Sequence, residues 1–194
     1  MAQKINDIQL LQLIEAAIFA SEQPLSVAEL QASVLQRFTV SKSRIDATIR
    51  QLQDDYSARG IVLQQTASGY RFQTRPELSD DLAQLWPERS ARYSRAVLET
   101  LALIAYKQPV TRGEIEEVRG VTVSSQIIRT LLDRGWVKVV GHKEVPGRPG
   151  LYATTALFLD YFGLKSLSDL PPLPEFTALT ADLLPTVEMT GELH

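Results

Sequence analysis

Cysteine is absent from this chain of 194 residues, and there are only two histidines, His142 and His194. Without cysteine the chain can form no disulfide, no cysteine-based zinc site and no cysteine nucleophile. Long hydrophobic runs are also missing. The longest, Leu101–Tyr106, has six residues, whereas a membrane-spanning helix needs roughly 20. The N-terminal segment is polar, unlike a secretory signal. We therefore expect a cytoplasmic protein with no membrane contact.

An excess of positive charge is missing as well. The chain has 20 Lys and Arg against 23 Asp and Glu, a net charge of -3. Free-standing DNA-binding domains are usually strongly basic, so the overall charge disfavours nucleic acid as the main ligand. The charges are unevenly placed, because residues 88–170 have an excess of basic residues whereas residues 171–194 carry four acidic residues and no basic one.

The residue patterns of common catalytic sites are not found. No glycine is followed by lysine, as a phosphate-binding loop requires. His142 lies in a predicted exposed hairpin, where it is poorly placed for a Ser-His-Asp relay. Glu114, Glu116 and Glu117 fall in the first turns of a predicted helix, where acidic residues complement the helix dipole. We expect no catalytic, cofactor-binding or metal-binding residues, no cofactor and no enzymatic activity.

The chain contains an internal repeat. Residues 13–30 match residues 98–115 at an offset of 85, and Arg59-Gly60 matches Arg134-Gly135 at an offset of 75. Two copies are too few for a solenoid, so the repeat indicates two domains in tandem. The first offset aligns Leu13 with Leu98, Ala17 with Ala102, Gln23-Pro24 with Gln108-Pro109, Ser26 with Thr111 and Glu29 with Glu114.

Each copy has the same order of predicted elements. A first helix (8–20 and 95–106) ends before a proline, and a second begins at a capping box, Ser26 with Glu29 or Thr111 with Glu114. A third helix carries one apolar stripe: Ile45, Ile49, Leu52 and Tyr56 in the first copy, and Ile127, Ile128, Leu131 and Leu132 in the second.

Gly60 and Gly135 follow these third helices, where left-handed caps are expected. Two strands come next, over 61–63 and 70–74 in the first copy and over 136–140 and 151–154 in the second. Three helices and a β-hairpin predict a winged helix. The fold class is therefore α+β, mainly α, with two tandem winged-helix domains.

The predicted domain organisation has four parts. Residues 1–86 form the first winged-helix domain, with a short helix at 77–86, and residues 87–94 form a connector. Residues 95–170 form the second domain, in which Thr155 caps a helix over 156–162 with Phe158, Tyr161 and Phe162 packed back on the domain. Residues 171–194 form an acidic tail that we expect to be disordered.

The surfaces of the predicted helices favour protein contact over DNA reading. The third helices mix acidic and basic residues, which suits groove entry poorly. The first helices are apolar on most sides, which requires a covering surface, either the neighbouring domain or another chain. The second hairpin carries Arg134, Lys138, Lys143 and Arg148, either as an ordinary solvated hairpin or as a wing that follows phosphates.

Several long motifs resemble the segregation and condensation protein B family, over about residues 8–173. In the second copy they are AVLETLALIAYKQPVTRGEIEEVRG at 96–120, RTLLDRG at 129–135, GRPGLYATT at 147–155 and FLDYFGLKSLSDLPPL at 158–173. In the first copy they are EAAIFAS at 15–21 and GYRFQTR at 69–75.

The resemblance implies a non-catalytic adaptor subunit of a condensin-like complex. It implies a homodimer that binds a kleisin subunit of the segregation and condensation protein A type and, through it, an SMC ATPase. That complex condenses and partitions the bacterial chromosome during cell division, so the chain would be associated with the nucleoid and any DNA contact would be indirect or weak. The alternative is a winged-helix DNA-binding transcription regulator, which should bind duplex DNA with a steep salt dependence.

Two candidate surfaces follow. For the kleisin, apolar anchoring and a forked arginine contact favour Leu103, Ile104, Tyr106 and Arg148. The resemblance places dimerisation in the first domain, where the apolar surface of the first helix offers Leu10, Leu13, Ile14 and Ala17.

Overall fold

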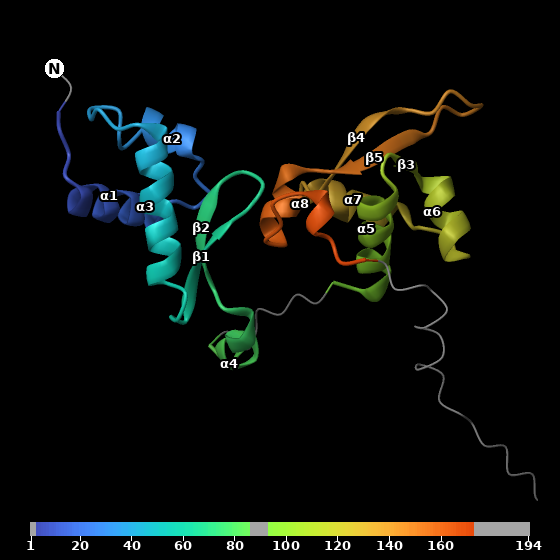
Figure 1. Ribbon diagram of the computed structural model, residues 1–194. Helices are drawn as coiled ribbons and strands as arrows, with labels where there is room; N and C mark the ends of the chain where they lie inside the picture. The colour runs from blue at the N-terminus through green and yellow to red at the C-terminus, as the bar shows by residue number, and fades with distance from the viewer. Residues whose placement is uncertain (1–2, 86–92, 173–194) are drawn as a thin grey trace, which may run out of the picture.

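The computed structural model describes residues 3–85 and 93–172 (Figure 1). Most of the predicted connector and nearly all of the predicted tail lie outside these residues. Helices predominate and the sheets are small and antiparallel, so the α+β, mainly α class is confirmed. No helix in 3–85 or 93–172 is long and apolar enough to cross a membrane.

The first half contains three helices and a β-hairpin. The elements are α1 (Asp7–Ala20), α2 (Val27–Ala32), α3 (Lys42–Asp55), β1 (Ile61–Gln65) and β2 (Tyr70–Thr74). The strands pair in register, with Leu63 opposite Phe72. A 3-10 turn, η1 (Pro76–Leu78), and α4 (Ser79–Ala83) follow, so the helix predicted over 77–86 is shorter and begins with a tighter turn.

The second half repeats this order with additions. Its elements are α5 (Arg95–Lys107), β3 (Val110–Thr111), α6 (Arg112–Arg119), α7 (Ser125–Asp133), β4 (Val137–His142), β5 (Gly150–Thr154), α8 (Ala156–Tyr161) and η2 (Leu167–Asp169). The sheet order is β3-β5-β4. Strand β3 was not predicted, because two residues are too short to show an alternating pattern.

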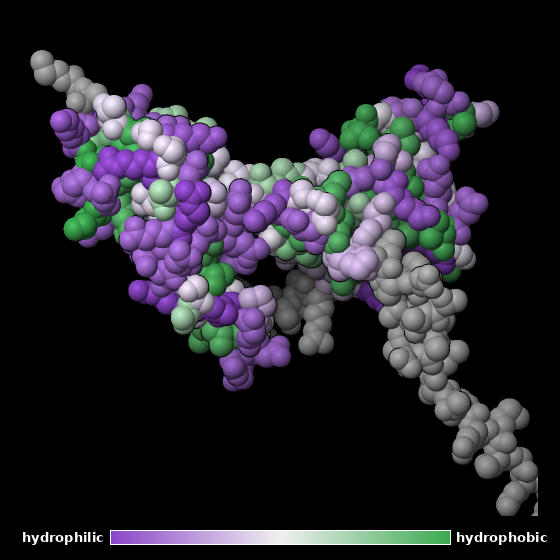
Figure 2. All heavy atoms as spheres, viewed as in Figure 1, coloured by the Kyte–Doolittle hydropathy of each residue, from purple (hydrophilic) through white to green (hydrophobic). Residues whose placement is uncertain are grey.

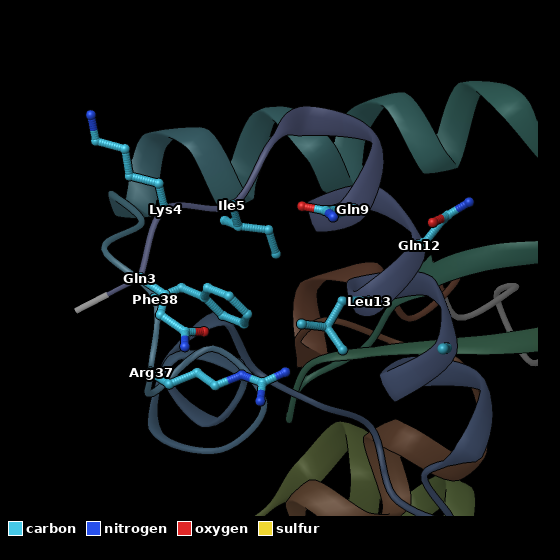
Figure 3. A pocket seen from close by; sticks show the side chains of 9 residues that line it. Gln3, Lys4, Ile5, Gln9, Gln12, Leu13, Arg37 and Phe38 are labelled. Carbon is cyan, nitrogen blue, oxygen red and sulfur yellow. The ribbon is translucent and has the colours of Figure 1, made fainter. Parts of the chain in front are cut away.

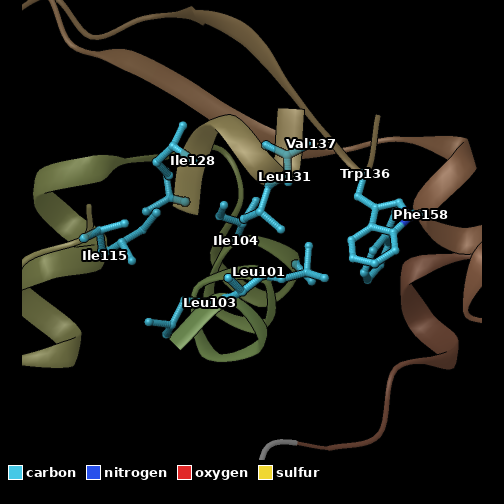
Figure 4. Close-up of a cluster of buried hydrophobic side chains, with 13 residues drawn as sticks. Leu101, Leu103, Ile104, Ile115, Ile128, Leu131, Trp136, Val137 and Phe158 are labelled. Atoms are coloured by element: carbon cyan, nitrogen blue, oxygen red, sulfur yellow. The ribbon is translucent and has the colours of Figure 1, made fainter. Parts of the chain in front are cut away.

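Hydrophobic side chains gather in two separate clusters. The first lies among α1, α2, α3 and β1, and the second among α5, α6, α7, β4 and α8 (Figure 4). Each half therefore has its own core, which is what a compact unit needs in order to bury its apolar faces.

Helix starts follow the predicted caps. The Ser26 and Thr111 side chains accept from the backbone N–H groups of Glu29 and Glu114, whose carboxylates accept in return. Both predicted capping boxes are confirmed. A third box, Asn6 with Gln9, was not predicted. Of the two expected glycine caps, Gly135 has φ 67, whereas Gly60 has no positive φ, so that prediction was wrong at Gly60.

Candidate partner interfaces

Two residues expected to anchor the kleisin lie inside the second core. Leu103 is 7% exposed and Ile104 is 0% exposed, and both point into the cluster shown in Figure 4. Helix α5 is the central helix of its unit and contacts α6, α7 and β5. The unit's own elements therefore cover the part of this helix that carries Leu103 and Ile104, and these two residues offer no surface to a partner.

Tyr106 lies half-buried at the end of the same helix. Its hydroxyl donates to the Pro171 carbonyl oxygen, so the ring joins the end of α5 to the last described residues. Next to it, the Gln108 side-chain oxygen accepts from the backbone N–H of Thr154 at 2.7 Å. Tyr106 thus sits on a surface that hydrogen bonds hold in place, and part of its ring remains accessible.

A groove of about 410 Å³ opens beside this helix end. Its lining contains both apolar and charged residues, and Val118 is 43% exposed. The groove is large enough to accept one or two side chains of a partner segment. Its lining residues are Lys107, Pro109, Val110, Glu114, Glu117 and Val118.

An ion pair connects this groove to the β4–β5 hairpin. Lys143 Nζ lies 2.6 Å from Glu114 Oε1. The hydrogen bond from Lys143, followed by those from Thr111, lowers the pKa of Glu114 to about 2. The base of the hairpin loop is therefore held against α6 by a carboxylate that stays ionised at all ordinary pH values.

Arg148 lies at the tip of the hairpin. Its side chain is 71% exposed and contacts Glu144 at 3.2 Å. Its backbone adopts φ 39, rare for a residue with a side chain. A partner carboxylate could replace Glu144, because an exposed pair of this kind contributes little by itself.

Sequence reasoning missed the apolar character of this hairpin. Val139, Val140 and Val145 are 45%, 48% and 40% exposed. Strand β4 lies at the edge of its sheet, and its register shifts between Val139 and Gly141. The adjacent pair Val139-Val140, which breaks the in–out alternation of a strand, was the signal available in the sequence.

The predicted dimer residues divide into two groups. Leu10 and Ile14 are both 0% exposed, because they repeat every four residues with Ile18 along the face of α1 that packs on α3. They cannot contact a second copy, and that part of the prediction is corrected. Leu13 and Ala17 are half-buried and remain partly accessible.

The accessible side of α1 carries apolar side chains that were not among the predicted dimer residues. Ile8 and Phe19 are 71% and 73% exposed. A groove of about 510 Å³ runs along this helix, and in Figure 3 Leu13 of α1 and Phe38 of the segment between α2 and α3 line it. The Arg37 guanidinium lies 4.9 Å from the centre of the Phe38 ring.

Apolar and polar residues are mixed over the rest of the visible surface. In Figure 2 the green apolar residues form small groups separated by purple polar ones. No group of three or more His, Cys, Asp or Glu within the described residues could hold a metal ion.

Comparisons with known proteins agree on one family. The family model described as "Segregation and condensation complex subunit ScpB" matches residues 12–173. A "Segregation and condensation protein B homolog" of Coxiella burnetii is 56% identical over 167 residues, covering 86% of this chain and 80% of that protein. Segregation and condensation protein B of Geobacillus thermodenitrificans is 48% identical over 168 residues, covering 84% of this chain and 78% of that protein.

One similar solved structure is that of ScpB from Mycobacterium tuberculosis. It has 33% sequence identity and a TM-score of 0.40, and it covers 84% of this chain and 99% of that one.

Proposed function

The chain belongs to the ScpB family of segregation and condensation complex subunits, and from this premise we propose that it is a non-catalytic adaptor that binds the kleisin subunit of an SMC complex. Through the kleisin it would reach the SMC ATPase and act at the nucleoid in chromosome condensation and partition. The family match over residues 12–173 is the observation that carries this proposal. The two helix-and-hairpin units, each with its own core, would act as tandem winged-helix domains.

The electrostatics of the second unit support an adaptor over a DNA reader. Among its described residues, six basic side chains already contact acidic ones within the unit. The neighbouring carboxylates lower the positive potential of this surface, which weakens the electrostatic attraction to phosphates that dominates DNA affinity. The pairs are Arg95 and Arg119 with Glu99, Arg112 with Glu116, Arg129 with Asp133, Lys143 with Glu114 and Arg148 with Glu144.

The kleisin surface follows from what remains accessible. We place it on Tyr106, the groove beside Val118 and the hairpin tip at Arg148, with the exposed valines of β4 in place of Leu103 and Ile104. Aromatic and arginine side chains supply most of the energy of protein interfaces. A partner segment with apolar residues and a carboxylate for Arg148 fits this surface.

The experiment is a pull-down of the full chain with its kleisin. Arg148→Glu combined with Tyr106→Ala should reduce capture at least about tenfold, because it reverses one charge and removes one ring. Arg129→Glu is the matched control. Arg129 is 76% exposed and pairs with Asp133 four residues away, as Arg148 is 71% exposed and pairs with Glu144. If a folded double variant captures the kleisin as well as the wild type does, this surface is not the kleisin-binding site. If the control variant also loses capture, the effect of the charge reversal is unspecific.

The dimer is the second part of the proposal. We place it on the accessible part of α1, where Leu13 lines the groove of Figure 3, Ala17 is half-buried and Ile8 and Phe19 are exposed. Ile8 and Phe19 are 71% and 73% exposed, and a second copy could cover this apolar area.

A further inference from the structure

The β1–β2 hairpin of the first half contacts helix α8 of the second, and the two lie side by side in Figure 1. The backbone N–H of Ser68, in the hairpin turn, donates to Asp160 Oδ1 at 2.9 Å. The Gln64 amide donates to the Gly163 carbonyl oxygen, and Arg71 Nη1 lies 3.5 Å from the Asp160 carbonyl oxygen. These bonds join residues that are 89 to 99 positions apart in the chain.

The residues on both sides are shaped for this contact. The Gln64 side-chain oxygen accepts from Gln73, which fixes the amide with its N–H groups toward α8. Gly163 has φ 69, and a Cβ at this position would lie 2.9 Å from Gln64 Nε2. A larger residue at 163 would therefore displace the end of the Gln64 side chain that makes this hydrogen bond, whereas glycine allows the close approach.

Asp160 is a buried acceptor in this contact. The residue is only 5% exposed, and a buried carboxylate is unfavourable unless hydrogen bonds compensate for the lost water. In the described part of the chain, the Ser68 amide provides such a bond from the other half. If the halves separate, water can replace that amide. The cost of opening is thereby limited, and the contact is suited to reversible use.

We propose that the hairpin turn and α8 form a reversible clasp that holds the two units together and opens when a partner engages either element. The two hydrophobic cores share no residue, so the units can separate without unfolding. In the closed state α8 covers the turn of the β1–β2 hairpin, which a winged helix would otherwise present to a ligand. The inference depends on the fold and not on the kleisin surface.

The test measures the distance between the units in the full chain. The absence of cysteine allows spin labels at two introduced sites, Gln51→Cys on α3 and Glu117→Cys on α6, both exposed. Dilution with unlabelled protein restricts the pulsed electron spin resonance signal to pairs within one chain, even if the protein dimerises. The parent should give one narrow distance distribution.

Asp160→Ala should shift the ratio of closed to open molecules by about tenfold, as expected for loss of a hydrogen bond to a charged group. Asp160→Ala combined with Gln64→Ala should broaden the distribution fully, with unchanged helix content by circular dichroism. Asp169→Ala is the matched control, because that carboxylate accepts from the backbone of Lys165 and Ser166 within its own unit.

Two results would overturn the clasp. One is a broad distribution in the parent. The other is a narrow, parent-like distribution in the folded double variant. Neither result bears on kleisin capture, which the pull-down measures separately.

Discussion

At the scale of single residues, burial separates two neighbouring aromatic rings. Phe158 is 4% exposed and Phe162 is 44% exposed, with their ring centres 5.0 Å apart. Phe158→Ala should lower the free energy of unfolding by about 3 kcal/mol, because it leaves a cavity in the core. Phe162→Ala should lower it by only about 1 kcal/mol, because the ring is largely exposed and its removal loses aromatic contacts with Trp136, Phe158 and Tyr161 but leaves no buried cavity. Urea unfolding followed by circular dichroism measures both, and equal losses would contradict the difference in burial.

Glu114 predicts a pH dependence of stability. Its pKa is lowered from 4.5 to about 2, first by the Lys143 hydrogen bond and then by those of Thr111. Because the folded pKa lies below the unfolded one, ionised Glu114 stabilises the fold above pH 4.5, and this contribution is lost as the pH falls toward 2. The side chain is 39% exposed, so solvent reduces the effect.

Glu114→Gln should therefore flatten the decrease in unfolding free energy between pH 4.5 and pH 2, while glutamine still serves the capping box. Urea unfolding at a series of pH values provides the measurement. Glu117→Gln, an exposed carboxylate on the same helix, should leave the slope unchanged. An unaltered slope in Glu114→Gln would show that other carboxylates dominate the acid response.

Residue-level expectations succeeded where they depended on local spacing. The boxes at Ser26 and Thr111 need only four consecutive residues, and the structure confirms both. The burial of Leu103 and Ile104 could not be predicted from local spacing, because it depends on which distant elements cover α5. A helix surrounded by its own unit and a helix that meets a partner have the same apolar sequence pattern.

At the scale of elements, two glycines in equivalent places should respond differently to the same substitution. Gly135 joins α7 to β4 with φ 67, and a Cβ there would lie 3.0 Å from Leu157. Gly135→Ala should lower the free energy of unfolding by about 1–2 kcal/mol, because a residue with a side chain is strained in the left-handed backbone conformation. Gly60 has no positive φ, and a Cβ there would lie 3.5 Å from the nearest atom, in the Leu78 side chain, which is an ordinary van der Waals contact.

Gly60→Ala should accordingly be neutral or slightly stabilising, since alanine reduces the entropy of the unfolded chain. Thermal unfolding of the two variants side by side tests the comparison. Similar losses in both would mean that Gly60 also needs conformations that alanine avoids.

The order of elements could be predicted well because it appears twice, and each copy supports the interpretation of the other. Boundaries were less certain. The second hairpin begins at Val137 and not at Trp136, and the helix expected over 77–86 becomes η1 and α4. Strand β3 exists because β5 is beside it, with Val110 opposite Tyr152. A two-residue segment has no pattern of its own that could show this pairing.

At the scale of the whole molecule, two separate cores explain why the apolar first helices need not both face a partner. Helix α5 packs on α6, α7 and β5 of its own unit and leaves Leu98 at 44% exposure, whereas α1 keeps Ile8 and Phe19 at 71% and 73% exposure. The contact between the hairpin and α8 could not be predicted, because it joins Ser68 to Asp160 across 92 positions. Sequence similarity between copies therefore does not imply the same surface in each.

This difference between the copies gives the last prediction, which concerns the dimer. Leu13 on α1 and Leu98 on α5 occupy equivalent positions of the repeat, Leu13 half-buried and Leu98 44% exposed. If two copies meet through α1, Leu13→Glu places two carboxylates in an apolar contact and should raise the dimer dissociation constant at least about 100-fold. Leu98→Glu makes the same chemical change outside that contact and should leave the constant within about threefold of the parent, because single surface substitutions usually change free energies little. Analytical ultracentrifugation of the full chain over a dilution series measures both constants. Dimers that survive in Leu13→Glu and dissociate in Leu98→Glu would move the interface to the second unit.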